Sequence, residues 1–217
     1  MNLNFEFIEA CKNGDLDKVK YLLTSPELKE HADIHADDDL GFRWACNNGH
    51  LEVVKYLLTS TNLKEHPDIH ARDDLGFRWA CEEGHLEVVK YLLTSPDLEE
   101  HADIHANEDW GFRLACREGH LEVVKFLLTS PELKEHADIH ARDDYGFQLA
   151  CSTGHLEVVK FHVFDMNFQL SLEAIKIINL MDNKEEIFNM FDKRELERKL
   201  QSGLKVQEEK QVKRTKI

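Results

Sequence analysis

Hydrophobic positions recur along most of the chain in a pattern that predicts pairs of short helices. The clearest segment, LEVVKYLLTS at residues 51–60, is apolar at Leu51, Val53, Val54, Tyr56, Leu57 and Leu58. A helix that faces water on one side would carry apolar residues over a narrower stripe. We therefore expect neighbouring elements to cover this helix on more than one side.

A shorter apolar run that ends in Ala-Cys precedes this helix, and two variable residues and a glycine separate the two segments. Glycine readily adopts the left-handed conformation that closes a helix. The order therefore predicts a helix, a glycine turn and a second helix. The glycines expected at these turns are Gly14, Gly49, Gly84, Gly119 and Gly154.

The cysteines set the period of the pattern. Each follows the previous one by 35 residues, and they are Cys11, Cys46, Cys81, Cys116 and Cys151. This spacing matches neither CxxC pairs nor a disulfide scaffold, so one structural position recurs in each unit. We expect a stack of similar units with the thiols in its core, because no single unit can bury its apolar faces alone.

The repeats predict an all-α solenoid at residues 1–165, with helix pairs near 5–25, 41–60, 76–95, 111–130 and 146–165. After Lys160 the pattern fails, and we expect residues 166–203 to form a divergent helical cap. The apolar residues expected to cover the last repeat or line this cap are Ile175, Ile178, Leu180, Met181, Ile187, Phe188, Phe191, Leu196 and Leu200. Residues 204–217 are basic and are expected to be disordered.

The charge balance narrows the classes of partner. The chain carries 27 basic and 42 acidic residues, a formal net charge of -15. This excess of acidic groups argues against binding to nucleic acid or to an anionic membrane, and it favours a basic protein surface. We find no apolar run long enough to span a membrane and no Sec-type signal at the N-terminus. We therefore expect a cytoplasmic protein in a reducing compartment.

The motif A-C-x-x-G-H-L-E-V-V-K-Y-L-L, followed after a spacer by A-D-I-H-A, resembles the ankyrin repeat. The resemblance covers about residues 5–165. It implies L-shaped units of two antiparallel helices and a projecting hairpin, stacked into a curved solenoid that binds proteins on its concave face. This variant of the repeat is similar to those of giant viruses and amoeba-associated intracellular bacteria, which suggests a host-interaction role and translocation into a host cell.

The sequence departs from the family pattern at the start of each first helix. Gly-Phe-Arg or Gly-Phe-Gln replaces the family's Thr-Pro-Leu-His, so Arg43, Arg78 and Arg113 occupy the histidine position. These arginines either bond carbonyl groups locally or project outward. The acidic tips before them, such as residues 37–39, should be tight and solvated. An insertion such as SPELKEH lengthens the connection after the second helix.

Several patterns could carry chemistry, but each has a simpler interpretation. The pairs His31/His35, His66/His70, His101/His105 and His136/His140 have a spacing that binds zinc on a helix, whereas here they lie in loops. The histidines of the Gly-His pairs begin second helices, where capping and packing need a polar group. The tips lack the alternating order of a calcium loop. We expect no cofactor, no metal site and no catalytic activity.

The leading hypothesis is a monomeric, non-enzymatic module that binds a partner protein on its concave face. Near-identical repeats differ at a few positions, and Trp110 and its counterparts are large apolar groups at a tip that the fold does not obviously bury. The residues expected to bind are Leu75, Arg78, Glu82, Glu83, Trp110, Arg113, Arg117, Tyr145 and Gln148. Trp44 and Trp79 share a position with Leu114 and Leu149, which indicates the core.

Two alternatives remain open. In the first, the C-terminal segment is a regulator that binds acidic lipid or nucleic acid through its basic end. In the second, the chain is a spacer with no target.

Overall fold

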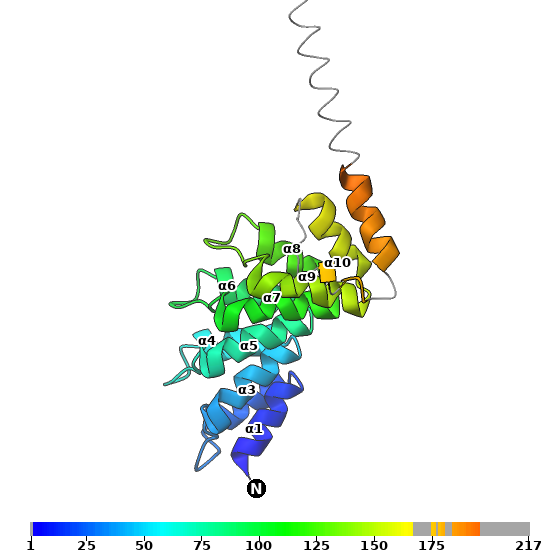
Figure 1. The fold of residues 1–217 in the computed structure, drawn as a ribbon. Coiled ribbons are helices and arrows are strands. Elements are labelled where there is room, and N and C mark those ends of the chain that lie inside the picture. Colours follow the sequence, from blue (N-terminus) through cyan, green and yellow to red (C-terminus); the bar gives the residue numbers. More distant parts are fainter. Residues whose placement is uncertain (1, 167–174, 177, 181–183, 196–217) are drawn as a thin grey trace, which may run out of the picture.

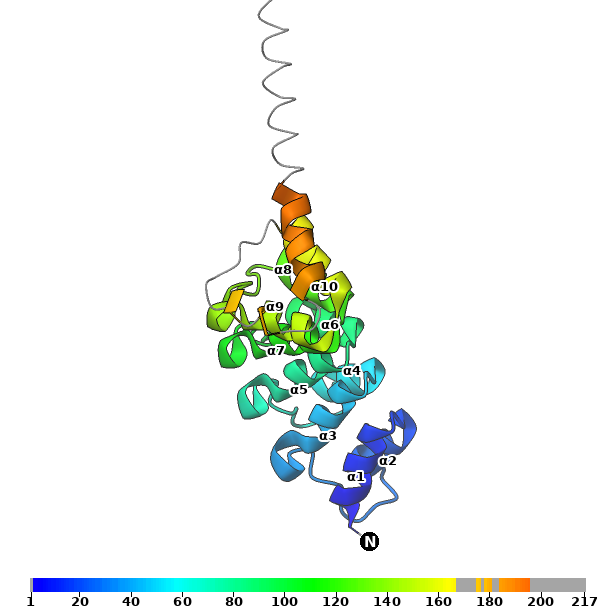
Figure 2. The same cartoon turned by 45° about the vertical axis from the view of Figure 1, so that its right-hand side comes forward.

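The computed structural model describes residues 2–166, 175–176, 178–180 and 184–195, and none of these residues forms a strand. The helices run in pairs along the chain and stack into an elongated solenoid (Figures 1 and 2). They are α1 (Leu3–Lys12), α2 (Leu16–Thr24), α3 (Ala36–Asn47), α4 (Leu51–Thr59), α5 (Ala71–Glu82), α6 (Leu86–Thr94), α7 (Ala106–Glu118), α8 (Leu121–Thr129), α9 (Ala141–Thr153), α10 (Leu156–Lys160) and the π-helical turn η1 (Phe161–Asp165). The expected all-α solenoid of helix pairs is confirmed.

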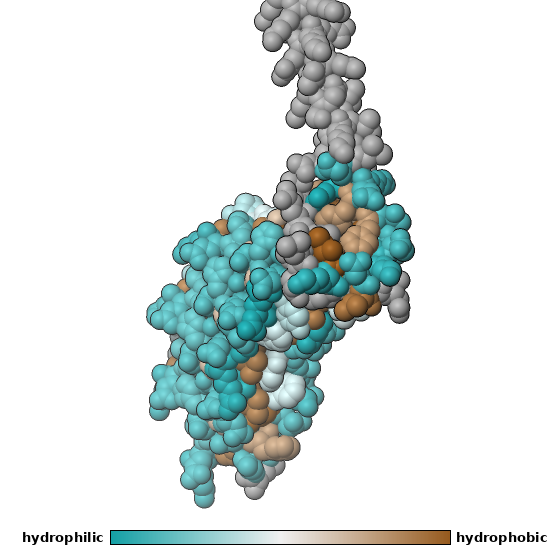
Figure 3. Space-filling model, in the orientation of Figure 1, coloured by the Kyte–Doolittle hydropathy of each residue, from teal (hydrophilic) through white to brown (hydrophobic). Residues whose placement is uncertain are grey.

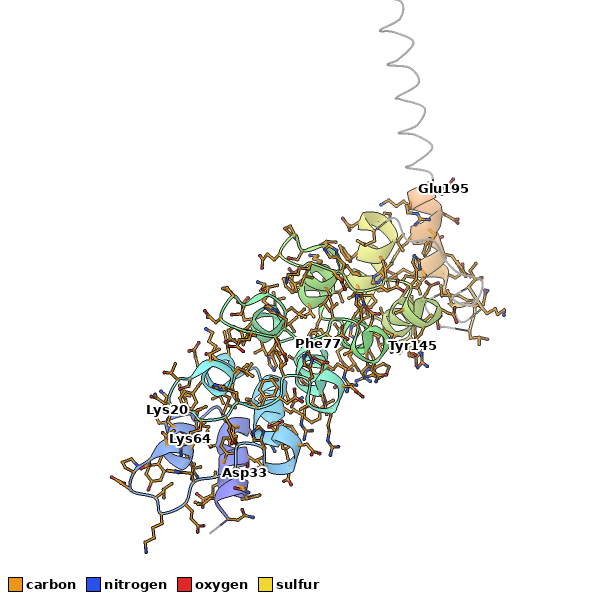
Figure 4. All side chains as sticks on the ribbon, turned by 90° about the vertical axis from the view of Figure 1, so that its left-hand side faces the viewer. Lys20, Asp33, Lys64, Phe77, Tyr145 and Glu195 are labelled. Atoms are coloured by element: carbon orange, nitrogen blue, oxygen red, sulfur yellow. The ribbon has the colours of Figure 1, made fainter. Side chains whose placement is uncertain are left out.

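The odd-numbered helices α1 to α9 form an inner row in which each helix packs against the next. Between the rows lies a continuous core, with one phenylalanine per repeat at the same position, as Figure 4 shows for Phe77. A glycine makes the close contact: a Cβ on Gly41 would lie 2.7 Å from the Phe7 ring of the preceding repeat. Gly-Phe therefore replaces the family's Thr-Pro-Leu-His as a packing contact between repeats.

The glycine turns between the paired helices have the expected left-handed conformation, with φ of +70° at Gly14 and +79° at Gly154. A histidine of the next repeat packs against each of the first four, and the His50 ring fills the space that a Cβ on Gly14 would need. The ring nitrogen Nε2 of His50 also donates to the carbonyl of Lys12 at 2.9 Å. These histidines therefore join repeats.

The expectation that the Gly-His histidines cap their own helices is wrong. His50, His85, His120 and His155 occupy the N-cap positions, yet none makes a side-chain capping bond in the part of the chain that the structure describes. In the first repeat, which has aspartate at this position, Asp15 does cap α2, since its Oδ1 accepts from the amide of Lys18 at 3.0 Å.

Each inner helix from α3 onward begins with a left-handed turn where the family resemblance implied a hairpin. Asp37, Asp38 and Asp39 have φ values of 54°, 57° and 60°, and the same conformation recurs at residues 72–74, 107–109 and 142–144. The tip is tight, as expected. The right-handed helix then continues through the Gly-Phe pair.

The arginine after each Gly-Phe pair bonds the carbonyl groups of this turn. Arg43 donates from Nε to the Asp38 carbonyl at 2.9 Å and from Nη2 to the Asp37 carbonyl at 2.6 Å. Arg78, Arg113 and Gln148 make corresponding bonds from Nη2 or Nε2 to carbonyls five or six residues earlier. Of the two alternatives for these side chains, the structure shows local bonding.

The C-terminal end covers the last repeat with apolar side chains from two described segments. Ile178, Ile187 and Met190 are buried, and residues 184–195 are helical. Leu180 is 87% exposed, so the expectation that it covers the stack is wrong. Met181, Leu196, Leu200 and the basic segment 204–217 lie outside the described residues. No helix in the described part is long and apolar enough to cross a membrane.

Candidate functional site

A row of large apolar side chains lies near the start of the inner helices, directly after the left-handed turn from α3 onward. They occupy one position of the repeat, and they are Phe5, Leu40, Leu75, Trp110 and Tyr145. Phe5 is 62% exposed and Tyr145 40% exposed, whereas the other three are half-buried. Figure 4 shows Tyr145 beside the inner row of helices, on the opposite edge of the stack from Lys20 and Lys64. The position therefore presents apolar area along one edge.

The next position on the same helix face lies four residues further along, and it is more exposed than expected. Trp44 and Trp79 are half-buried and contact each other across repeats, with ring centroids 5.3 Å apart. The ammonium of Lys12 lies 4.8 Å from the Trp44 ring. Of the residues at this position, Leu114 is fully in the core. Trp44 and Trp79 lie four residues after Leu40 and Leu75, and this helical spacing was the sequence signal that places them on the same helix face.

The variable pairs at the end of the inner helices complete this face. Arg117 forms an ion pair with Glu82 of the preceding repeat and a second with Glu118, for which the Arg117 Nε to Glu118 Oε1 distance is 2.6 Å. The hydrogen bond to Glu118 raises the pKa of Arg117. Glu83 is exposed and points to solvent at the same edge. The face thus combines aromatic groups with paired and unpaired charges.

Three of the residues expected to bind a partner lie inside the fold. Arg78, Arg113 and Gln148 are only 8%, 1% and 4% exposed because each reaches back to bond its own left-handed turn. Burial lowers the pKa of both guanidinium groups. These residues therefore support the tip from beneath and do not offer a surface to a partner.

Arg113 also contacts two aromatic groups of the row. Its Cζ lies 4.5 Å from the centroid of Trp110 and 5.9 Å from that of Tyr145 in the next repeat. Its Nε and Nη1 are buried without a hydrogen-bond partner among the described residues, and the guanidinium faces the two rings in cation–π contacts. The guanidinium thus lies between Trp110 and Tyr145 of successive repeats.

A family model for ankyrin repeats, in three copies, matches residues 7–108 and 79–169. The chain belongs to the ankyrin-repeat family. A search of curated proteins found no match. Ankyrin repeats are typically modules for protein–protein interaction and are usually non-catalytic, which agrees with a surface of aromatic and charged groups.

The loop histidines of this ankyrin stack are held by separate partners. In the first pair, the ring nitrogen Nε2 of His31 donates to the Ser25 carbonyl at 2.9 Å, whereas Nδ1 of His35 lies 2.7 Å from Oδ1 of Asp39. In the described residues, no three His, Cys, Asp or Glu side chains are grouped to hold a metal ion. The His-x-x-x-His spacing therefore reflects two structural roles.

The expectation that the acidic tips are solvated throughout is wrong for the last residue of each. Asp39, Asp74, Asp109 and Asp144 are buried. Asp74 Oδ1 accepts the backbone N–H of Asp103 at 3.0 Å, and Asp109 Oδ1 accepts that of Asp138 at 2.9 Å. A buried carboxylate thus joins its own repeat to the next one.

All five cysteines are buried, as expected, and their thiols are not joined in disulfides. Burial raises the pKa of each thiol, to about 12 for Cys151 and well above the usual value for Cys46, Cys81 and Cys116. A thiol of this kind is a poor nucleophile because the thiolate is disfavoured. The cysteines therefore act as small core residues.

Proposed function

We propose that this ankyrin solenoid binds a partner protein through the inner face, which we define as Phe5, Leu40, Trp44, Leu75, Trp79, Glu82, Glu83, Trp110, Arg117 and Tyr145. One observation carries the proposal. A framework repeated almost verbatim presents a large apolar group from each repeat along one edge, and the type of that group changes from leucine to tryptophan and tyrosine. Aromatic groups of this kind are enriched among the residues that dominate binding energy.

The charges of the inner face and of the whole chain favour a basic partner. The net charge is -15, and Glu83 lies exposed beside the aromatic row. Such a field raises the association rate of a positively charged protein, and salt weakens the effect.

The partner class that we would test first is a host-cell protein. The resemblance of the repeat to those of giant viruses and amoeba-associated intracellular bacteria supports this choice. Buried, reduced cysteines agree with a cytoplasmic site of action. We propose that the chain acts as a monomer, because the paired helices of the stack bury their apolar faces within the chain.

The experiment is affinity capture from host lysate with three full-length chains. The first is the wild type, and the second carries Trp110→Ala and Tyr145→Ala. The third carries Tyr21→Ala, which removes an aromatic group that is 44% exposed on α2. Circular dichroism must show that all three are equally folded. We expect a partner that the wild type and Tyr21→Ala retain and that the double variant loses.

Binding of the purified partner then gives the size of the effect. Removing two aromatic anchors should weaken Kd by about 100-fold, since a central anchor contributes roughly 1–2 kcal/mol or more. Equal capture by all three chains would contradict the inner-face proposal and place binding on the loops or the C-terminal segment. A complete lack of capture would favour the spacer alternative.

A further inference from the structure

Three grooves recur on the edge of the stack where the long loops lie. Each is bounded by the end of an even-numbered, outer helix (α2, α4 or α6) and by the loops of two successive repeats, and their volumes are about 370, 360 and 210 Å³. We call them grooves 1, 2 and 3 in chain order. Groove 1 includes Lys64, which Figure 4 places on the opposite edge of the stack from Tyr145. The grooves are therefore distinct from the inner face.

The floor of each groove is apolar and comes from the same two positions of the repeat. A leucine near the end of the outer helix and an isoleucine of the loop line it: Leu23 and Ile34 in groove 1, Leu58 and Ile69 in groove 2, Leu93 and Ile104 in groove 3. The isoleucines are buried and the leucines are half-buried. A side chain that reaches the floor of a groove therefore contacts hydrocarbon.

The rims of the grooves are acidic. Glu65, Glu100 and Glu135 stand at the equivalent position of the three grooves, and their side chains are 72%, 77% and 75% exposed. Groove 2 adds Asp97 and Glu99 and has no lysine, whereas grooves 1 and 3 each include one. Figure 3 shows mainly hydrophilic residues over the loop side of the stack. Groove 2 is thus the most negative of the three.

An apolar floor beneath an acidic rim matches the chemistry of lysine and arginine. Their methylene groups bury against hydrocarbon while the cationic end stays at the polar edge. Volumes near the lower limit of small-ligand pockets, about 300 Å³, suit a single long side chain. The same rim would repel phosphate and carboxylate groups. Each groove therefore selects one basic side chain.

The spacing of the grooves limits the conformation of the occupant. Packed helices lie about 8–10 Å apart, so grooves one repeat apart are separated by roughly 10 Å. In a polyproline II helix, side chains three residues apart lie on the same face and about 9 Å apart. A β-strand does not fit, because residues three apart point to opposite sides.

We propose that the three grooves form a second binding surface for an extended segment of a partner protein with a lysine or arginine at every third residue. The segment lies across the loop edge in a polyproline II conformation and places one basic side chain in each groove. Groove 2 contributes most of the electrostatic attraction.

The test measures fluorescence anisotropy of two labelled peptides with the full-length chain at low salt. The first peptide, Lys-Pro-Ser-Lys-Pro-Ser-Lys, has lysines in the register of the grooves. The second has the same composition with its three lysines adjacent. We expect the first peptide to bind about tenfold more tightly, because three separate pairs form only in that register.

A pair of matched variants separates the grooves from the general charge of the chain. Asp97→Asn, Glu99→Gln and Glu100→Gln remove the rim of groove 2, whereas Glu52→Gln, Glu87→Gln and Glu122→Gln remove the same charge from the outer helices. The groove variant should bind the first peptide about tenfold more weakly, and the helix variant should change Kd less than about twofold. Equal affinity of the two peptides, equal loss in the two variants, or no binding would overturn the proposal.

One further occupant must be distinguished, because Lys210, Lys213 and Lys216 of this chain also lie three residues apart. If Lys213→Gln with Lys216→Gln strengthens binding of the first peptide and not that of the second, the chain's own C-terminal segment competes for the grooves, and the proposal of a partner segment fails. Trp110→Ala with Tyr145→Ala should leave peptide affinity unchanged. The groove proposal and the inner-face proposal can therefore fail independently.

Discussion

The aspartate that ends each left-handed turn connects three parts of the structure through one side chain. Asp74 lies 3.0 Å from Nδ1 of His70 and accepts the amide of Asp103 in the next repeat at the same distance. Burial raises the pKa of this carboxyl, while the bonds from Asp103 and His70 act in the opposite direction. The side chain is therefore held by the hydrogen bonds that it accepts.

We predict that Asp74→Ala lowers the free energy of unfolding by about 1–3 kcal/mol, because the amide of Asp103 would lose its charged acceptor in a part-buried hydrogen bond. Asp74→Asn should cost less than half as much. Asn4 holds the equivalent position in the first repeat, and its Oδ1 accepts the amide of Asp33 at 2.9 Å. Urea denaturation followed by circular dichroism measures both. Equal losses in the two variants would show that charge, and not the acceptor, is what matters.

His162 gives the stability of the C-terminal repeat a pH dependence. Its ring is buried, and Nδ1–H donates to the Val158 carbonyl at 2.8 Å. Burial lowers its pKa from 6.5 to about 4. Between these values the unfolded chain binds the proton more strongly than the folded chain, so stability is full above about pH 6.5 and falls as the pH drops toward 4.

The predicted loss from this group is at most about 3 kcal/mol over that range. His162→Leu removes the titrating group and keeps an apolar side chain beside Phe147, whose ring centroid lies 5.7 Å from that of His162. Thermal unfolding at pH 7.5 and pH 5 should show a smaller difference for the variant than for the wild type. The same difference in both proteins would assign the pH dependence to other histidines.

At the scale of the element, two glycine turns allow the contact between a glycine and the histidine of the next repeat to be tested, because one turn has this contact and the other lacks it. Gly119 and Gly154 have the same φ of +79°, but a Cβ on Gly119 would collide with the His155 ring, and a Cβ on Gly154 would meet nothing within 4 Å. Alanine at either position must adopt the left-handed conformation, which costs roughly 1–2 kcal/mol.

We therefore predict that Gly154→Ala destabilises by about 1–2 kcal/mol and that Gly119→Ala destabilises by about 1–3 kcal/mol more, since overpacking adds to the strain. Denaturant unfolding of the two variants gives the difference directly. If the two alanines cost the same, the histidine can move aside, and its packing against glycine contributes little to the coupling of repeats.

The left-handed turns predict a stabilising substitution. Asp73 is exposed at the centre of its turn with φ of 56°. Asp73→Gly should raise the free energy of unfolding by up to about 1 kcal/mol, because glycine adopts this conformation without strain. Asp73→Val should lower it, since a β-branched residue is disfavoured there. Thermal melting gives the Tm of the wild type and of the two variants. A higher Tm for Asp73→Val than for the wild type would argue against a left-handed turn at this position.

The sequence was sufficient to predict the helix pairs, the glycine turns and the buried cysteines, because each rests on a local preference repeated at a fixed period. It was not sufficient for the left-handed turns. Three successive residues without glycine in this conformation oppose local preference, and they depend on bonds from Arg43 and on the buried Asp39. Such a turn follows from tertiary contacts that a pattern of residue types does not contain.

Some residues of the inner face were predicted from the sequence, and others were not, because burial again depends on tertiary contacts. Trp110 and Tyr145 were identified because they vary against a repeated background, and both lie at the surface. Arg78, Arg113 and Gln148 were placed on the face because they lie near those positions in the sequence, yet they bond their own turns. Trp44 and Trp79 were assigned to the core because Leu114 and Leu149 share their position, but of these four side chains only Leu114 is buried.

At the scale of the whole molecule, charge should affect stability and binding in opposite directions. A net charge of -15 on an elongated stack produces self-repulsion that salt screens within about 10 Å at 0.1 M. We predict that raising NaCl from about 50 to 500 mM increases Tm by a few degrees while it weakens binding to a basic partner. Differential scanning calorimetry and anisotropy titrations over the same salt series test the two halves.

The opposite result for Tm has a specific meaning. Ion pairs such as Lys55 with Glu52 and Arg117 with Glu82 are weakened by salt, but exposed pairs contribute only about 0.2–1 kcal/mol each. A falling Tm would show that these local pairs outweigh the general repulsion. In that case many acidic side chains would be engaged in ion pairs within the chain. Less negative charge would then be available to attract a partner than the net charge indicates.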